Sequence, residues 1–298
     1  MKRVVLLALA LLVVAVAALL GYGYYWLTDR VDGKYFTHDG VRIFYTDEGQ
    51  GDPVVLIHGF AVNADLNWRR PGITQALAKN YRVIAMDLRG HGLSDKPHDP
   101  AKYGKAMVDD VIALLDHLNI KKAHVVGYSL GGVITLNLAA YHSDRLLTAA
   151  PLGAGWEDPH DSAFLDACSK MADALESGKS IGPVAAALSG KREAPGRIHT
   201  LWVKLMTGYF NDRLALAAMM RIMTGLAVSE DALEHISVPL LSIVAEHDPL
   251  KLGVDRMKGK VKDQTIVIIP GADHISAVSN PLFLESLTKF LAAHKTTT

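Results

Sequence analysis

The chain has 298 residues, half of them hydrophobic, which is enough for one large domain with a substantial core. Its 31 lysines and arginines balance 31 aspartates and glutamates, so no net charge directs it to nucleic acid. The single cysteine, Cys168, cannot form an intramolecular disulfide, and no cysteine and histidine cluster has the spacing of a zinc site. We therefore expect no metal, no cofactor and no nucleic-acid partner.

The first residues differ in composition from the rest of the chain. Lys2 and Arg3 precede an uncharged stretch, 4–27, which as a helix would reach about 36 Å and cross a hydrocarbon core of about 30 Å. We predict that residues 1–29 are an uncleaved single-pass anchor that leaves the remaining chain on the outer side of the membrane. The alternatives are a signal peptide cleaved at the Ala-x-Ala site 15–17, which would release a secreted protein, and a buried core helix.

From residue 34 onward, short apolar runs alternate with amphipathic helical segments. The runs predict strands at 41–45, 54–57, 81–87, 123–126, 146–150, 240–244 and 266–269. Between and after them, the periodicity predicts helices at 75–79, 106–118, 130–140 and 283–291. Such alternation is typical of a mostly parallel sheet with helices on both faces.

The alternation breaks between residues 155 and 236. This part has no strand pattern, but it has helical periodicity at 198–206 and 214–222, with a polar loop near 190–196 between them. We therefore predict a core formed by 30–155 and 236–298 and a helical cap at 156–235. Several large apolar side chains of the cap could line a pocket or simply pack against the core: Trp156, Phe164, Trp202, Met206, Met219, Met220 and Met223.

The pentapeptide 127–131, Gly-Tyr-Ser-Leu-Gly, matches the G-x-S-x-G pattern of a nucleophilic serine. The pattern alone is weak, because glycine and serine are common. Its context strengthens it, since it follows a predicted strand and opens a predicted helix. In such a tight turn the flanking residues must be small and the serine Oγ is exposed. Ser129 is therefore our candidate nucleophile; the alternative is a glycine-rich turn with an incidental serine.

A serine needs a base, and His274 follows the last predicted strand, where it would share a sheet edge with Ser129. Asp248 follows the preceding strand and could orient that histidine. The order serine, aspartate, histidine is the one expected on an α/β sheet. Other carboxylates remain possible as the acid: Asp273, Glu246 and Asp158.

A tetrahedral oxyanion requires two backbone N–H donors close to the nucleophile. The N–H of Leu130 is one candidate, because it lies at a helix N-terminus. The second is the N–H of Phe60, since the loop His58-Gly59-Phe60 follows an adjacent strand. We expect the side chains of Phe60, Tyr128 and Trp156 to contact substrate, whereas His58 is interpreted as structural or pocket-lining.

Together these motifs, with the stretch 87–95 and the sequence Gly-Ala-Asp-His at 271–274, resemble the α/β-hydrolase superfamily. The resemblance covers roughly 34–155 and 236–295, and the last motif departs from the Gly-x-Gly-His that the family usually has. It implies an α/β fold with a mostly parallel eight-stranded sheet, a catalytic triad and a helical cap inserted after the sixth strand. Within the family, a serine nucleophile disfavours haloalkane dehalogenases and epoxide hydrolases, which use aspartate.

The simplest reaction for these groups is hydrolysis of a carboxylic ester through an acyl-enzyme on Ser129. The apolar cap and the predicted membrane anchor favour a hydrophobic small-molecule ester as the substrate. Hydrolysis of a C–C bond, acyl transfer and a non-catalytic binding function remain alternatives. The oligomeric state is not predicted.

Overall fold

The structure is a computed structural model that describes residues 32–158, 161–179, 182–183 and 211–296. The chain divides into two compact units, Met1–Asp32 and Gly33–Thr298. The predicted anchor at 1–29 lies outside the described residues and stays a prediction. Among the described residues, no helix has the length and apolar character needed to cross a membrane.

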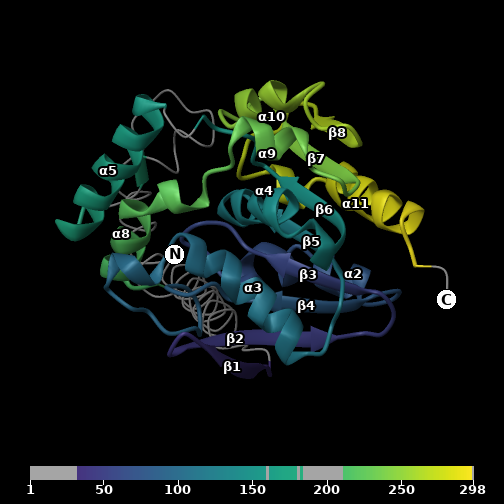
Figure 1. The fold of residues 1–298 in the computed structure, drawn as a ribbon, viewed down its shortest axis with the longest axis horizontal. Coiled ribbons are helices and arrows are strands. Elements are labelled where there is room, and N and C mark those ends of the chain that lie inside the picture. Colours follow the sequence, from purple (N-terminus) through teal and green to yellow (C-terminus); the bar gives the residue numbers. More distant parts are fainter. Residues whose placement is uncertain (1–31, 159–160, 180–181, 184–210, 297–298) are drawn as a thin grey trace, which may run out of the picture. The chain divides into compact units, whose positions relative to one another are not determined.

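The second unit is built on one eight-stranded sheet with the order β1-β2-β4-β3-β5-β6-β7-β8 (Figure 1). β1 pairs antiparallel with β2, and β2 pairs antiparallel with β4, while all the later pairs are parallel. The mostly parallel sheet predicted from the sequence is confirmed. Its strands are β1 Lys34–His38, β2 Val41–Glu48, β3 Pro53–Ile57, β4 Arg82–Met86, β5 Ala123–Tyr128, β6 Leu146–Leu152, β7 Leu240–Ala245 and β8 Gln264–Ile269.

Helices cover both faces of the sheet because alternate side chains of the central strands are apolar on both sides. Val55 and Ile57 of β3 belong to one hydrophobic cluster, with α3 (Lys105–His117) and α4 (Leu130–Tyr141). Val54 and Leu56 belong to the other cluster, with α2 (Ile73–Leu77) and α11 (Pro281–Ala293). The shorter helical segments are η1 Asp65–Arg69, η2 Pro100–Lys102, η3 Ser143–Arg145, η5 Ala277–Ser279 and α10 Lys251–Met257.

The helical insertion follows β6, the sixth strand. Its described elements are α5 Ser162–Glu176, α8 Arg213–Arg221, η4 Met223–Leu226 and α9 Glu230–Glu234. In Figure 1, α5 and α8 lie side by side. Buried residues of both helices, among them Leu175 and Leu216, belong to the same hydrophobic cluster as α3 and α4. The insertion therefore packs on the core over the face that carries α4.

The helices predicted at 106–118, 130–140, 214–222 and 283–291 match α3, α4, α8 and α11 to within two residues at each end. The helix predicted at 198–206 lies outside the described residues. β1 was not predicted, since Phe36 is the only buried residue among its five and the strand has no apolar alternation to detect. Such partial exposure is expected of an edge strand.

Candidate active site

Ser129 occupies the sharp turn between β5 and α4. Its backbone has φ +54° and ψ −114°, a conformation that side-chain-bearing residues rarely adopt. The turn is held because the Ser129 N–H donates to the carbonyl of Leu152 at 2.8 Å and the Ser129 carbonyl accepts from the N–H of Val133 at 3.0 Å. A strained residue that is fixed in this way at the end of a strand is typical of a functional site.

Steric constraints require glycine at both glycine positions of the pentapeptide. A β-carbon at Gly127 would lie 1.9 Å from the carbonyl oxygen of Gly131. A β-carbon at Gly131 would lie 2.1 Å from the carbonyl oxygen of Ile57, the last residue of β3. Both separations are far below van der Waals contact, so the turn beside Ser129 forms only with glycine at these two positions.

His274 and Asp248 form a buried pair on the loops that follow β8 and β7. The Nδ1 of His274 lies 2.7 Å from Oδ2 of Asp248, and the second carboxylate oxygen accepts from the N–H of Leu250 at 2.8 Å. The parallel register pairs Ala245 with Ile269, which brings the two loops to one edge of the sheet. Because Nδ1 is bonded to the carboxylate, Nε2 is the nitrogen that remains for proton transfer.

The other carboxylates considered as the acid have different surroundings. Oδ1 of Asp273 accepts from the N–H groups of Ile275 and Ser276, so this side chain holds its own turn. Glu246 accepts from the N–H of Gly271 at 2.8 Å. Asp158 lines the cavity described below. Of the four candidates, Asp248 is the one whose carboxylate is hydrogen-bonded to the ring of His274.

The structure places Tyr128 differently from our expectation that it contacts substrate. Its side chain is only 6% exposed and belongs to the cluster beneath α11, whereas the described residues that line the cavity do not include it. The reason is strand alternation: Val126 and Tyr128 of β5 face α11, and Val125 faces α4. That alternation was available in the sequence and would have predicted this placement.

The loop after β3 lies beside the nucleophile. A β-carbon at Gly59 would come within 3.3 Å of the β-carbon of Ser129, so the backbone that leads into Phe60 runs against the serine. The N–H of Gly59 donates to Oδ1 of Asn67 at 2.9 Å, which fixes this loop. Sequence reasoning missed Asn67, because it lies in the π-helical turn η1 and matches no motif. Phe60 and Leu130, whose N–H groups are the candidate oxyanion donors, line the same cavity as Ser129.

His58 is fully buried and has both ring nitrogens engaged. Its Nε2 accepts from the N–H of Leu88 at 3.0 Å, so Nδ1 carries the proton and donates to the carbonyl of Gly59 at 2.7 Å. Burial lowers the pKa of His58, partly opposed by the charge of Asp87 nearby. The ring is therefore a neutral bridge between two loops, and its interpretation as structural fits these contacts.

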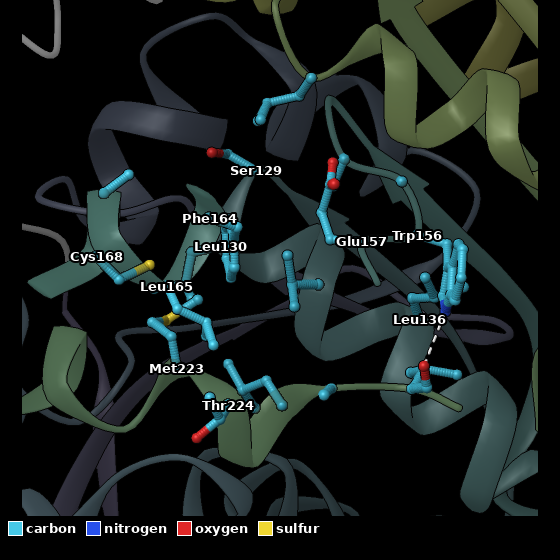
Figure 2. Close-up of a pocket in the computed structure, with 18 of the residues that line it drawn as sticks. Ser129, Leu130, Leu136, Trp156, Glu157, Phe164, Leu165, Cys168, Met223 and Thr224 are labelled. Carbon is cyan, nitrogen blue, oxygen red and sulfur yellow. Dashed lines mark hydrogen bonds between the residues drawn. The ribbon is translucent and has the colours of Figure 1, made fainter. Parts of the chain in front are cut away.

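A cavity of about 310 Å³ opens beside Ser129, and Figure 2 shows the side chains around it, with Ser129 toward one end and Thr224 toward the other. The lining is largely apolar and comes from α4, the segment after β6 and the insertion. Phe60, Leu130 and Trp156, all predicted site residues, belong to it. Its other apolar side chains include Val133, Leu136, Phe164, Leu165, Met171, Met220, Met223, Leu226 and Val228.

Two acidic residues, Glu157 and Asp158, also line the cavity, and no lysine, arginine or histidine does so among the described residues. Glu157 pairs with Arg256 of α10 at 2.7 Å. Burial raises the pKa of Glu157, and Arg256 partly offsets this. Trp156 is fixed by its indole N–H, which donates to the carbonyl of Val228 at 2.8 Å (Figure 2). Met219 is buried away from the cavity lining, and Trp202 and Met206 lie outside the described residues.

Within the described ranges, no group of three or more histidine, cysteine, aspartate or glutamate side chains is arranged to hold a metal ion.

The sequence and the fold are similar to those of known proteins. The model of the alpha/beta hydrolase fold family matches residues 52–179. A 2-hydroxymuconate semialdehyde hydrolase of Pseudomonas sp. strain CF600 is 38% identical over 124 residues, which are 41% of this chain and 43% of that protein. A putative non-heme chloroperoxidase of Synechocystis sp. is 27% identical over 274 residues, covering 83% of this chain and 95% of that protein.

A solved structure of an N-acyl homoserine lactone degrading enzyme is 25% identical, with a TM-score of 0.66, and the alignment covers 86% of this chain and all of that one. With its sheet order, its helical insertion after β6 and these matches, the chain belongs to the α/β-hydrolase superfamily. The chain spans less than half the length of the hydrolase from strain CF600, so the activity of that protein is not carried over as a finding.

Proposed function

We propose that this protein is a serine hydrolase that cleaves a carboxylic ester with an uncharged, hydrophobic acyl part. One observation carries the proposal: Ser129, held in a strained turn, opens into a largely apolar cavity at the sheet edge that also carries the His274–Asp248 pair. These are the groups that acyl transfer to a serine requires, and the reaction needs no further cofactor.

In the proposed reaction, Nε2 of His274 takes the proton of the Ser129 hydroxyl as Oγ attacks the ester carbonyl. Asp248 holds the imidazole in the required tautomer and stabilises its protonated form. The N–H groups of Leu130 and Phe60 stabilise the tetrahedral oxyanion. The alcohol leaves with the proton from His274, and a water molecule, deprotonated by the same nitrogen, then releases the acid from Ser129.

The lining of the cavity supports an uncharged acyl part. An anionic substrate would find no basic side chain among the described lining residues to balance its charge. This argues against the reaction of the relative from strain CF600, since 2-hydroxymuconate semialdehyde is by its name a carboxylate. The lactone degraded by the structural neighbour is a cyclic ester, and this supports ester chemistry.

A fluorophosphonate probe and a series of p-nitrophenyl esters test the proposal. We expect one probe per wild-type molecule, none on Ser129→Ala, and unchanged labelling of the matched control Ser143→Ala beyond the far end of α4. We expect kcat/KM to rise by up to about two hundredfold from acetate to hexanoate, because each of the added methylenes contributes about 0.8 kcal/mol when buried.

Three results would contradict ester hydrolysis. Turnover of a vinylogous C–C hydrolase substrate without turnover of any ester would favour the C–C reaction. Transfer of the acyl group to an added alcohol in preference to water would favour an acyltransferase. Folded wild-type protein that takes up no probe at all would indicate a non-catalytic binding protein.

For residues 1–29 we propose a single-pass membrane anchor with the hydrolase domain on the outer side. The uncharged stretch 4–27 behind Lys2 and Arg3 supports it. A protease added to intact cells should then degrade the domain, and washed membranes should retain it. Full recovery in the soluble fraction, with the N-terminus intact, would contradict the anchor, and a shortened N-terminus would instead indicate a cleaved signal peptide.

A further inference from the structure

We propose that Tyr128 is a positioning residue for the base: its ring supports the imidazole of His274 and its hydroxyl holds the backbone of the loop that carries this histidine. The inference rests on the proposed function, because it assigns His274 the role of the base. It replaces the substrate contact expected for Tyr128 from the sequence, and it uses a side chain that the described cavity lining does not include.

Two contacts join Tyr128 to His274. The tyrosine hydroxyl donates a hydrogen bond to the backbone carbonyl of His274, a residue 146 positions later in the chain. The two rings lie with their centroids 5.1 Å apart and their planes inclined by 33°. Because Tyr128 directly precedes Ser129, these contacts connect the loop of the base to the residue next to the nucleophile.

The residues packed around Tyr128 hold its ring in one position. Gly153 adopts φ +55°, and a β-carbon there would lie 2.7 Å from Cε2 of the tyrosine, so the position accommodates the ring only as glycine. On another side, Phe283 of α11 packs edge-on at 5.9 Å between centroids. The ring is thus fixed by Gly153, His274 and Phe283, which suits it to hold a second ring in place.

Asp248 and Tyr128 restrain His274 in complementary ways. The carboxylate of Asp248 binds Nδ1 and restrains that edge of the imidazole, while the tyrosine ring packs against the imidazole and limits its tilt. Burial raises the pKa of Tyr128 well above its usual value, and the negative charges of Asp248 and Asp273 raise it further. The hydroxyl therefore stays protonated and remains a donor. A base held in one orientation transfers a proton faster, because less reorientation precedes the transfer.

The test compares Tyr128→Phe and Tyr128→Leu with Tyr103→Phe. Tyr103 is a matched control, because it is also a buried tyrosine whose hydroxyl donates to a backbone carbonyl, that of Pro97 at 2.6 Å. For Tyr128→Phe we expect kcat and the rate of fluorophosphonate labelling to fall together by about fivefold, the effect of one net hydrogen bond. KM should stay within about twofold, and Tyr128→Leu, which also lacks the ring, should lose about a hundredfold.

Complete labelling, counted per folded molecule, should remain one probe per chain in all three variants. If Tyr128→Phe changed KM alone, the residue would be a substrate contact. If it lowered kcat no more than Tyr103→Phe does, its role would be purely structural. Either result would overturn the inference.

An NMR measurement keeps this test separate from the test of the proposed function. The imidazole proton bonded to Asp248 should give a far-downfield resonance that Asp248→Asn removes. In Tyr128→Phe this proton should exchange with water faster than in wild type, and in Tyr103→Phe it should not. Unchanged exchange in Tyr128→Phe would overturn the positioning role, even in a protein that hydrolyses no ester. Loss of probe labelling in wild type would instead overturn the proposed function.

Discussion

Two buried histidines lie near buried aspartates in loops that follow strands of the sheet, but their hydrogen bonds differ. His58, after β3, has both ring nitrogens bonded to backbone groups. Its neighbour Asp87 accepts from the N–H of Ala64 and of Leu93, one with each oxygen. His274, after β8, has Nδ1 on the carboxylate of Asp248, so Nε2 remains for chemistry.

The difference separates the loop-holding contacts of His58 from the proton transfer that we propose for His274. A histidine with two backbone partners is fixed as a neutral ring, and protonation would break the bond that its Nε2 accepts. A histidine whose Nδ1 is bonded to a carboxylate is held in one tautomer and keeps Nε2 as the nitrogen that can accept a proton. The direct partner of the ring thus distinguishes the two roles, whereas burial does not, since both rings are almost inaccessible.

The largest effect is expected for His274→Ala. We expect kcat to fall about 10⁴-fold or more, because neither deprotonation of Ser129 nor protonation of the leaving group has another donor or acceptor. The free energy of unfolding should change by no more than about 2 kcal/mol, since Asp248 keeps its bond from Leu250. Ester kinetics and urea unfolding measure both. A residual activity within a hundredfold of wild type would exclude His274 as the base.

His58→Phe should show the opposite pattern. The N–H of Leu88 and the carbonyl of Gly59 would lose their partners, at a cost of about 1–3 kcal/mol each. We expect kcat per titrated site to remain within about tenfold of wild type. If this variant instead kept its stability and lost activity as completely as His274→Ala, the distinction drawn between the two histidines would be wrong.

The smallest effect is the pH dependence of stability below neutrality. Burial lowers the pKa of His91 from 6.5 to about 3 and that of His124 to about 4, so the native state keeps both rings neutral where the unfolded chain is protonated. The stability that the two neutral rings permit is present in full above pH 6.5. It is lost as the pH falls from there toward their native-state pKa values. For each ring, the free energy of unfolding should fall by up to about 1.4 kcal/mol per pH unit.

Urea unfolding at pH 7.5, 6.5 and 5.5 measures this loss, and His91→Gln should reduce its slope. Asp87 acts in the opposite direction, because burial raises its pKa and the native carboxyl then takes up a proton before the unfolded one does. The difference in slope between wild type and His91→Gln therefore isolates the contribution of the histidine. A wild-type stability that stays constant from pH 7.5 to 5.5 would contradict the neutral, buried state of His91 and His124.

Several parts of this molecule follow from local patterns. The run 54–57 is apolar throughout because β3 is covered on both faces, and 123–126 has the same character, so both strands were predictable. The turn at Ser129 was predictable because Gly127 and Gly131 have to be small there. The neighbouring positions of Asp248 and His274 followed from the rule that parallel strands end at one edge.

Other parts depend on contacts that no local pattern encodes. The contacts of His58 and the role proposed for His274 depend on hydrogen-bond partners that come from other loops. Asn67 fixes the loop of Gly59 from a short π-helix that has no sequence signature. Tyr128 is a third kind of case, since strand alternation would have predicted which way it points, but its motif led us to expect a substrate contact instead.

The tie between Tyr128 and His274 has a consequence for biosynthesis. The strained turn and the loop of Gly59 lie in the first half of the chain, but the histidine arrives 146 residues after Tyr128, on the loop behind the last strand. If Ser129 and His274 act as proposed, a ribosome that has released the serine has not yet produced its base. On that mechanism the serine lacks a proton acceptor until β8 pairs with β7, so an incomplete chain would not form the acyl-enzyme.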